Sequence, residues 1–287
     1  MDAFSKCHPA VNFLFFVGAI GFGVVIQHPA YLAAGLVSGL IYHLVLTGPK
    51  GWKLPLAMVP VFVLITVINP VFNTYGKTVL FLFFGRNYTL EALIYGMTLG
   101  GMFVLMMLWF SCYNQVLTSD KFVCLFGSLI PSLSLLLVMI LRLMPSFMRK
   151  TRQILGARNS IGKGTNEHAS VKERILAGTT VMSALTDWAL EGSIVTADSM
   201  RARGYGTAKR TNFQIYRFTA RDILLLAVML VLAATVLALG GTAASFTPDY
   251  SADPVGWGLA AYGVFLLLPV ILHVKEAIVW RISISKM

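Results

Sequence analysis

The chain has 287 residues, of which 57% are hydrophobic and 12% are charged, with a mean hydropathy of +0.75 and a formal net charge of +11. Soluble domains carry about a quarter charged residues, so this composition excludes an ordinary soluble protein. It predicts an all-α integral membrane protein: a polytopic helix bundle built from apolar segments that cross about 30 Å of hydrocarbon.

Seven apolar windows are long enough, or nearly long enough, to cross a membrane. They are residues 10–26, 31–46, 54–68, 90–110, 122–141, 223–239 and 257–274. Lys6 precedes the first window without a clear small-x-small cleavage site, so we expect a retained span. A short run at residues 79–85 and the Asn69-Pro70 pair are the two places where a half-membrane element would fit.

Cations concentrate in the second half of the chain. Fourteen of the 23 Lys and Arg residues lie between Arg142 and Arg221, with five of the twelve acids. The positive-inside rule predicts that this block is cytoplasmic, together with both termini and the loop that carries Lys50 and Lys53. Residues 242–255 carry two aspartates and no cation, so they are expected outside.

These assignments require an even number of spans before Arg142. The window at residues 122–141 contains Pro131 and is therefore expected to form a re-entrant piece followed by an apolar helix under the bundle, which leaves six spans. The predicted parts are a membrane bundle (residues 1–121), the re-entrant and cytoplasmic segment (122–220) and C-terminal membrane helices (221–287).

Residues suited to catalysis or metal binding are sparse. The three cysteines and five histidines have no ligand spacing, so no metal, cofactor or disulfide is expected. Gly162-Lys163 is no phosphate loop, because Ala157 takes the first glycine position and Gly164 replaces the required Ser or Thr. No carboxylate lies within the apolar centres, which argues against an ion-driven carrier. We expect no enzymatic activity.

The most specific motif is A-D-S-M-R-A-R-G-Y-G at residues 197–206. It places Arg201 and Arg203 at the C-terminal end of a helix, before Gly204, a residue suited to the left-handed capping conformation. Cations in a last turn can complement the helix dipole by about 0.3–1 kcal/mol, or they can bind an anionic partner. The spacing alone does not decide between these roles.

The helix before this motif is amphipathic. Steps of three and four residues give one apolar stripe, formed by Leu190, Ile194, Ala197 and Met200. Leu190 and Ile194 are expected to pack on the chain's own membrane helices, whereas Met200, with its flexible thioether, suits a partner contact. Asp198 is placed to pair with Arg201 three residues later.

Together these segments resemble the transmembrane T components of energy-coupling factor (ECF) transporters, the EcfT/CbiQ family. The likeness covers most of the chain and is most specific in W-A-L-E at residues 188–191 followed by the motif at 197–206. Supporting stretches are His8-Pro9, N-P-V-F-N-T-Y-G at 69–76, T-L-E-A-L-I-Y-G at 89–96, T-S-D-K-F at 118–122 and L-R-L-M-P at 141–145.

The resemblance implies a non-catalytic scaffold of the cell membrane. In such transporters the T component holds a substrate-binding S component and docks two cytosolic ABC-type ATPases through two coupling helices, each ending in Ala-Arg-Gly. The second motif is here Ala202-Arg203-Gly204, flanked by Met200 and Arg201, on a helix expected to begin near Thr186. The implied function is uptake of a vitamin or transition-metal ion, without nucleic-acid binding.

The first coupling motif departs from the family pattern, and two registers are open. The register that keeps the spacing from Pro145 places Ser160-Ile161-Gly162 at the motif, with no arginine. The other uses Ala157-Arg158-Asn159, with Asn159 as the left-handed residue. We favour the first register, in which the two ATPase contacts are chemically unequal.

Other features of the first coupling helix allow more than one interpretation. Arg149, Lys150 and Arg152 suit either the ATPase surface or anionic lipid headgroups. Its apolar part, residues 135–141, is expected to pack against Leu185, Trp188 or the ends of the spans. Two other protein classes are an inner-membrane docking or assembly protein and the permease of another ABC importer, although the E-A-A-type loop of such permeases is absent.

Overall fold

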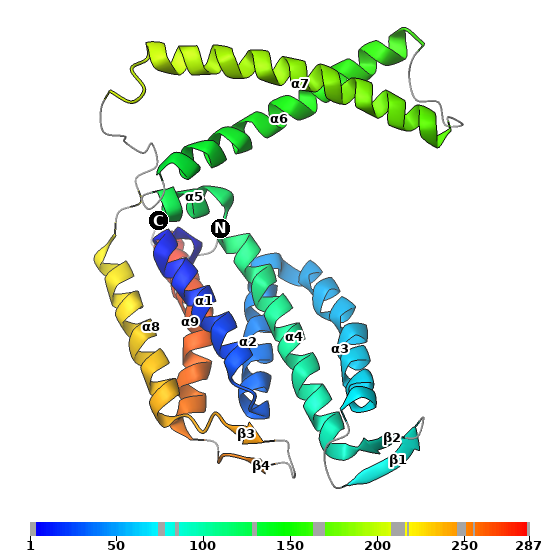
Figure 1. The fold of residues 1–287 in the computed structure, drawn as a ribbon. Helices are drawn as coiled ribbons and strands as arrows, with labels where there is room; N and C mark the ends of the chain where they lie inside the picture. The colour runs from blue at the N-terminus through cyan, green and yellow to red at the C-terminus, as the bar shows by residue number, and fades with distance from the viewer. Residues whose placement is uncertain are drawn as a thin grey trace. The chain divides into compact units, whose positions relative to one another are not determined.

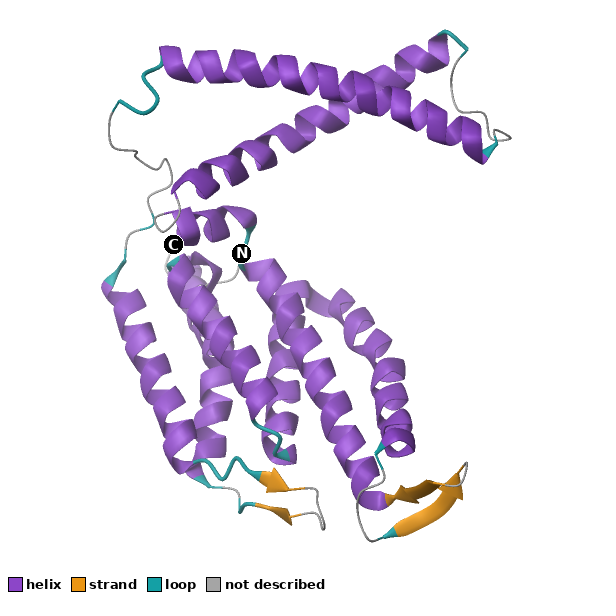
Figure 2. Ribbon diagram, in the orientation of Figure 1, coloured by secondary structure: helices purple, strands orange, loops and turns teal. Residues whose placement is uncertain are grey.

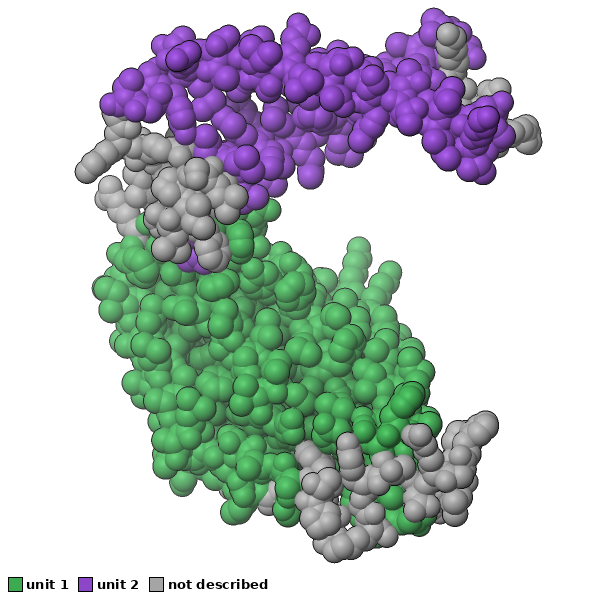
Figure 3. Space-filling view, in the orientation of Figure 1, with its two compact units in different colours: residues 1–122, 216–287 green, residues 123–215 purple. Residues whose placement is uncertain are grey.

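Nearly all of the described chain is helical, with two short β-hairpins (Figures 1 and 2). The structure, a computed structural model, describes residues 4–73, 78–83, 86–127, 131–162, 170–207, 216, 218–245, 251–254 and 256–285. Lys163, Gly164 and residues 74–76 of the N-P-V-F-N-T-Y-G stretch lie outside these ranges. The chain divides into two units, one comprising Met1–Phe122 and Tyr216–Met287, the other Val123–Ile215 (Figure 3).

Six long helices make up the described part of the first unit. They are α1 (Pro9–Val25), α2 (Pro29–Thr47), α3 (Lys53–Phe72), α4 (Leu90–Val116), α8 (Ala220–Leu239) and α9 (Trp257–Ser285). Successive helices run in opposite directions (Figure 1). Helix α4 packs against α1, α2 and α3, while α9 packs against α2 and α8.

Four segments of the described chain are long and apolar enough to cross a membrane. They are Pro29–Phe72, Leu90–Val116, Ala220–Leu239 and Trp257–Ser283. The first combines α2 and α3 with the 3-10 turn η2 (Gly48–Trp52) between them, and α1 is apolar but has only 17 residues. Length and composition thus support an all-α membrane protein with four candidate spans, not the expected six.

The outer surface of this unit is apolar, as a lipid environment requires. On α3, Leu56 and Phe72 are each 72% exposed. Large contiguous apolar patches are rare on soluble monomers, so these side chains are compatible with a membrane protein. The interior is filled instead by aromatic rings.

The buried centre lies around Trp109 of α4. Its ring packs edge-on against Phe15 of α1, with centroids 5.7 Å apart, and lies 6.1 Å from the ring of Tyr42 of α2. The Trp109 indole nitrogen donates to the carbonyl of Gly35 at 3.3 Å, so the ring's polar atom is also satisfied inside the bundle. Three helices are thereby fixed to one side chain.

A β-hairpin follows α3 in the first unit. Residues 79–83 of the short apolar run form β1 (Val79–Phe83), which pairs antiparallel with β2 (Arg86–Thr89). A second hairpin joins β3 (Ala244–Ser245) to β4 (Ser251–Ala252).

The Asn69-Pro70 pair does not interrupt α3, which continues to Phe72. Pro70 has no N–H to donate to the carbonyl of Thr66 one turn earlier. A Cβ on Gly96 of α4 would lie 2.8 Å from that carbonyl oxygen. The glycine therefore lets α4 approach the freed carbonyl closely, and packing of this kind tolerates proline within a membrane helix.

The sequence His-Pro-Ala occurs twice and caps a helix each time. The backbone N–H of Ala10 donates to His8 Nδ1, and that of Ala30 donates to His28 Nδ1, both at 3.2 Å. Proline follows at the first helical position, where its missing N–H is not needed. His28 Nε2 also lies 3.1 Å from the carbonyl oxygen of Asp253, which ties the start of α2 to the second hairpin.

The residues before α1 hold the opposite end of the unit together. Lys6 Nζ lies 2.9 Å from Glu276 Oε1 of α9, and the backbone N–H of His8 donates to Asp222 Oδ1 of α8 at 3.1 Å. The buried Lys121 ammonium of α5 (Ser119–Gly127) donates to the carbonyl of Ser5 and, at 2.9 Å, to that of Val116. Three helices are thus bound to one short segment.

Candidate docking site on the crossing helices

Two long helices dominate the second unit. Helix α6 (Pro131–Ser160) runs through Pro145 without interruption, and α7 (Val171–Ala202) crosses it as an X (Figure 1). The window expected to hold a re-entrant piece, residues 122–141, is divided between α5 and α6. We refer to α6 and α7 together as the crossing pair.

Helix α7 begins at Val171, well before the expected start near Thr186. Ser170 Oγ accepts from the Glu173 N–H at 3.3 Å, and a Glu173 carboxylate oxygen accepts from the Ser170 N–H at 2.9 Å. This reciprocal capping box satisfies two N–H groups that a helix start leaves unpaired. The S-x-x-E pattern was the sequence signal for the true start.

The C-terminal end of α7 is a Schellman motif. Gly204 has a φ of 77°, its N–H donates to the Arg201 carbonyl at 3.0 Å, and the Tyr205 N–H donates to the Met200 carbonyl at 3.0 Å. These bonds pair carbonyls that the last turn would otherwise leave free. The expected left-handed conformation of Gly204 is confirmed.

The C-terminal end of α6 shares the left-handed glycine and one of these two hydrogen bonds. Gly162 has a φ of 73°, and its N–H donates to the Asn159 carbonyl at 3.1 Å, as Gly204 does to Arg201. Counted back from each glycine, Ile161 takes the position of Arg203 and Ser160 that of Ala202.

The backbone at Asn159 differs from the conformation that one of the two expected registers requires. Asn159 belongs to α6, so it is not the left-handed residue that Ala157-Arg158-Asn159 requires. The helix instead ends with Ser160-Ile161-Gly162, which we call the α6 tip. Ala202-Arg203-Gly204 is the α7 tip.

Both tips are open to solvent and lie on opposite sides of the crossing (Figure 1). Ile161 is 69% exposed, and Ser160, Ala202 and Arg203 are also exposed, whereas Arg158 is half-buried. The same backbone position therefore presents an isoleucine on α6 and an arginine on α7.

An aromatic contact holds the crossing pair together. The rings of Phe147 and Trp188 meet edge-to-face with centroids 5.3 Å apart, and Lys150 Nζ lies 5.8 Å from the centroid of the Trp188 ring. Trp188, one of the three partners expected for residues 135–141, therefore lies at the crossing. Its ring partner is Phe147, further along α6 than those residues.

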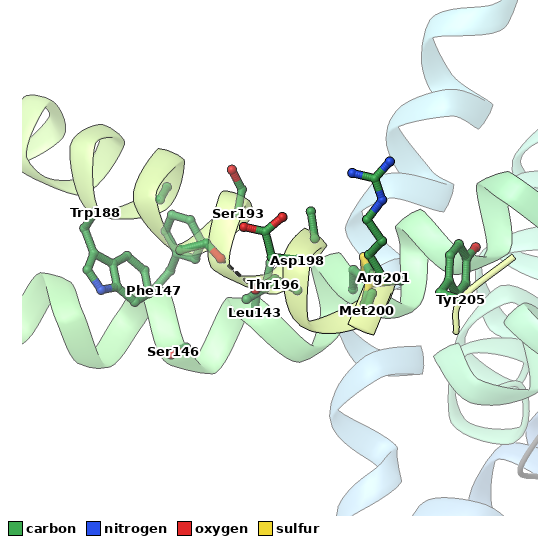
Figure 4. Close-up of a pocket in the computed structure, with 14 residues that line it drawn as sticks. Leu143, Ser146, Phe147, Trp188, Ser193, Thr196, Asp198, Met200, Arg201 and Tyr205 are labelled. Carbon is green, nitrogen blue, oxygen red and sulfur yellow. Dashed lines mark hydrogen bonds between the residues drawn. The ribbon is translucent and has the colours of Figure 1, made fainter. Parts of the chain in front are cut away.

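A groove of about 870 Å³ lies between the N-terminal half of α6 and the C-terminal half of α7 (Figure 4). The α6 side contributes Met139, Leu143, Ser146 and Phe147. The α7 side is mostly small, with Ala189, Gly192, Ser193, Thr196 and Ala197 before Met200, Arg201 and Tyr205. This groove was not predicted from the sequence, although small residues spaced by three and four indicate a close helix contact.

One expectation for the α7 surface is wrong, and another stays a prediction. Leu190 and Ile194 are 61% and 64% exposed, so the second unit itself does not bury them. Asp198 and Arg201 form no ion pair among the described residues, and the Arg201 guanidinium points away from the Asp198 carboxylate (Figure 4). Ala197 and Met200, the other members of the apolar stripe, line the groove.

Charge is distributed unevenly over the crossing pair. Helix α6 contains five cations and no acid, namely Arg142, Arg149, Lys150, Arg152 and Arg158. Helix α7 contains three cations and four acids. The basic charge of α6 is therefore spread along most of its length, whereas that of α7 lies at its two ends, with Lys172 and Arg174 in the first turn and Arg201 in the last, followed by Arg203.

Within the described ranges, no group of three or more His, Cys, Asp and Glu side chains lies where it could hold a metal ion. No protein-family model matches the sequence, and no curated protein matches it significantly. The likeness to ECF T components thus rests on the residues quoted for it.

Proposed function

We propose that this chain is the transmembrane coupling subunit of an ECF-type ABC importer, linking two cytosolic ATPases to a substrate-binding S component. The observation that carries the proposal is the pair of matching helix ends. Both α6 and α7 stop at a left-handed glycine with the same backbone hydrogen bond, and the two ends lie on opposite sides of one crossing. Two exposed ends that share this glycine conformation suit two related ATPase subunits.

The α7 tip has the chemistry to bind a carboxylate. An arginine presents a planar fork of N–H donors that can form two parallel bonds to one carboxylate. The Schellman motif fixes the backbone under Arg203, so less conformational freedom is lost when a partner binds. We place the docking contact at Arg203, with Arg201, Met200 and Ala202 beside it.

The chain itself is proposed to perform no chemistry, and ATP hydrolysis belongs to the partners. Closure of two ATPases that each hold one tip changes the angle between α6 and α7. Such a change repacks a small contact, here the Phe147 and Trp188 rings, and needs no titrating group in the membrane. The S component supplies the substrate, a vitamin or a transition-metal ion.

We further propose that all six long helices of the first unit cross the cell membrane. The turn η2 separates α2 from α3, so Pro29–Phe72 provides two crossings, and the 17 residues of α1 reach about 25 Å. His28 joins Asp253 at one end of the unit, whereas Lys6 joins Glu276 at the other. Lys6, Lys50 and Lys53 mark the second end as cytoplasmic.

Purification of the full-length protein from its native membranes tests the proposal. Two ATP-binding chains and a small membrane protein should co-purify. Arg203→Ala should weaken ATPase binding by about 2–5 kcal/mol if the pair is buried, and Arg203→Lys should restore only part of it. The matched control is Lys172→Glu, which reverses an exposed charge at the other end of α7.

Unchanged ATPase retention and unchanged uptake in Arg203→Glu would contradict the docking assignment. Co-purification of a cytosolic partner without any ATP-binding chain would instead identify a docking or assembly protein of another kind.

A further inference from the structure

The two tips of the crossing pair are alike in backbone and unlike in side chain. Gly162 and Gly204 have φ values of 73° and 77°, and each donates to the carbonyl three residues earlier, at 3.1 and 3.0 Å. At matched positions the α7 tip region carries Arg201 and Arg203, whereas α6 carries Asn159 and Ile161. The two positive charges of the α7 end therefore correspond to uncharged residues at the same positions of α6, where the nearest cation, Arg158, takes the position of Met200.

The exposed side chain at the α6 tip has chemistry opposite to that at the α7 tip. Ile161 is 69% exposed and follows the last turn of α6 directly. We call the partner surface that receives a tip a socket. If a socket that holds a carboxylate for Arg203 received Ile161 instead, the negative charge of the carboxylate would be buried without a cation to pair with. A socket that accepts Ile161 by apolar contact would desolvate the guanidinium of Arg203 without a partner.

We infer that the two tips bind two different sockets, an acidic one for Arg203 and an apolar one without a carboxylate for Ile161. This inference rests on the proposed function, because it takes the sockets to lie on the two ATPase subunits. These subunits are then non-identical, and each binds only one side of the crossing pair. The chain therefore dictates which ATPase lies under α6 and which under α7.

Adding a positive charge at the α6 tip tests the inference. An apolar socket and an acidic socket predict opposite changes in the affinity for the ATPase under α6. With an apolar socket, Ile161→Arg should weaken binding of the ATPase under α6 by about tenfold or more, while Ile161→Leu should change it less than threefold. With two acidic sockets, Ile161→Arg would create a second clamp and tighten binding, which would overturn the inference.

The matched control for this substitution is Gln153→Arg. Gln153 is exposed on α6 and lies eight residues before Ile161, so Gln153→Arg adds the same net charge away from the positions matched to Arg201 and Arg203. The full-length complex, purified from native membranes, is titrated with each ATPase after salt stripping. An equal loss for both arginine variants would indicate a general charge effect and would also overturn the inference.

Photocrosslinking identifies the two sockets directly while leaving Ile161 and Arg203 in place. Ser160 and Ala202 occupy matched exposed positions, so p-benzoylphenylalanine is introduced at one or the other in cells. We expect adducts on two different ATP-binding polypeptides, with Asp or Glu near the Ala202 adduct and an apolar surface at the Ser160 adduct. Adducts on the same peptide of one polypeptide would overturn the inference alone; adducts on no ATP-binding polypeptide would overturn the proposed function with it.

Discussion

Gly204 and Gly162 have backbone conformations that favour glycine. Both have positive φ values. A residue with a Cβ in that conformation destabilises the fold by roughly 1–2 kcal/mol relative to glycine. We expect Gly204→Ala to fray the last turn of α7, speed amide exchange at Tyr205 and reduce ATPase retention. Hydrogen exchange followed by mass spectrometry measures the first two effects.

A glycine within the same helix provides the control for this substitution. Gly178 is helical, and a Cβ there would meet nothing within 4 Å, so Gly178→Ala should stabilise α7 by about 0.5–1 kcal/mol. The docking geometry would be wrong if Gly204→Ala left the exchange of Tyr205 unchanged.

His8 makes the first unit sensitive to pH. Burial lowers the pKa of its imidazole, and the nearby Asp222 carboxylate opposes part of this effect. Nδ1 accepts the N–H of Ala10, which requires an unprotonated nitrogen. Because the folded pKa lies below the usual 6.5, this contribution to stability is complete above that value and is lost as the pH falls through the lowered pKa.

The consequence is measurable as a melting temperature in detergent. The melting temperature should be steady above about pH 6.5, the usual pKa of histidine, and should fall as the pH is lowered below that value. His8→Asn keeps a capping acceptor that does not titrate, so its melting temperature should fall less. An equal fall in both proteins would rule out His8 as the source.

At the scale of elements, Trp188 is the side chain that couples α6 to α7. Aromatic pairs contribute about 0.5–1.5 kcal/mol beyond area burial, and an exposed cation over a ring about 0.5–1 kcal/mol. Trp188→Ala should therefore loosen the crossing and impair uptake while both ATPases still bind. Leu190→Ala, at an exposed site two residues later, should do neither; loss of ATPase binding in Trp188→Ala would show that the residue docks a partner instead.

Most helices could be predicted because local sequence patterns specify where each helix lies. The contacts between the helices could not be predicted in this way. Apolar windows and terminal glycines indicated α1 to α4, α8, α9 and the stop of α7. Two further features could also have been predicted from local patterns. The S-x-x-E pattern at Ser170 marks the start of α7, and the repeated His-Pro-Ala sequence marks the caps at His8 and His28. The pairing of β1 with β2, the burial of Lys121 and the Phe147 contact depend on residues distant in sequence, which no local pattern specifies.

For the whole molecule, the number of membrane crossings depends on whether Pro29–Phe72 crosses once or, with a turn between α2 and α3, twice. In cells, an impermeant maleimide should label Ser251→Cys from outside but neither Lys50→Cys nor Ser199→Cys, in a background without Cys7, Cys112 and Cys124. Inverted vesicles should show the reverse, since all three sites are exposed and cations mark the cytoplasmic face. Lys50→Cys protected on both sides would mean that Pro29–Phe72 crosses once.

The crossing pair also has a consequence that follows from plane geometry. The Phe147 and Trp188 contact divides each helix near its middle, into arms of about 20–25 Å at 1.5 Å per residue. When two rigid rods pivot at a central point, closing the angle between the two C-terminal arms also closes the angle between the two N-terminal arms. The other two angles, each between an N-terminal arm and a C-terminal arm, then widen. The groove lies in one of these widening angles, because its walls are the N-terminal arm of α6 and the C-terminal arm of α7.

Drawing the two tips together should therefore part the walls of the groove. Spin labels at Leu143 and Thr196, which line opposite walls, should move apart when the ATPases bind ATP; a constant or shorter distance would exclude pivoting. Since the arms are nearly equal in length, the ends of the crossing pair move by similar distances on both sides of the pivot. The crossing pair converts the approach of two ATPases into a separation of similar size, with a change of direction and no amplification.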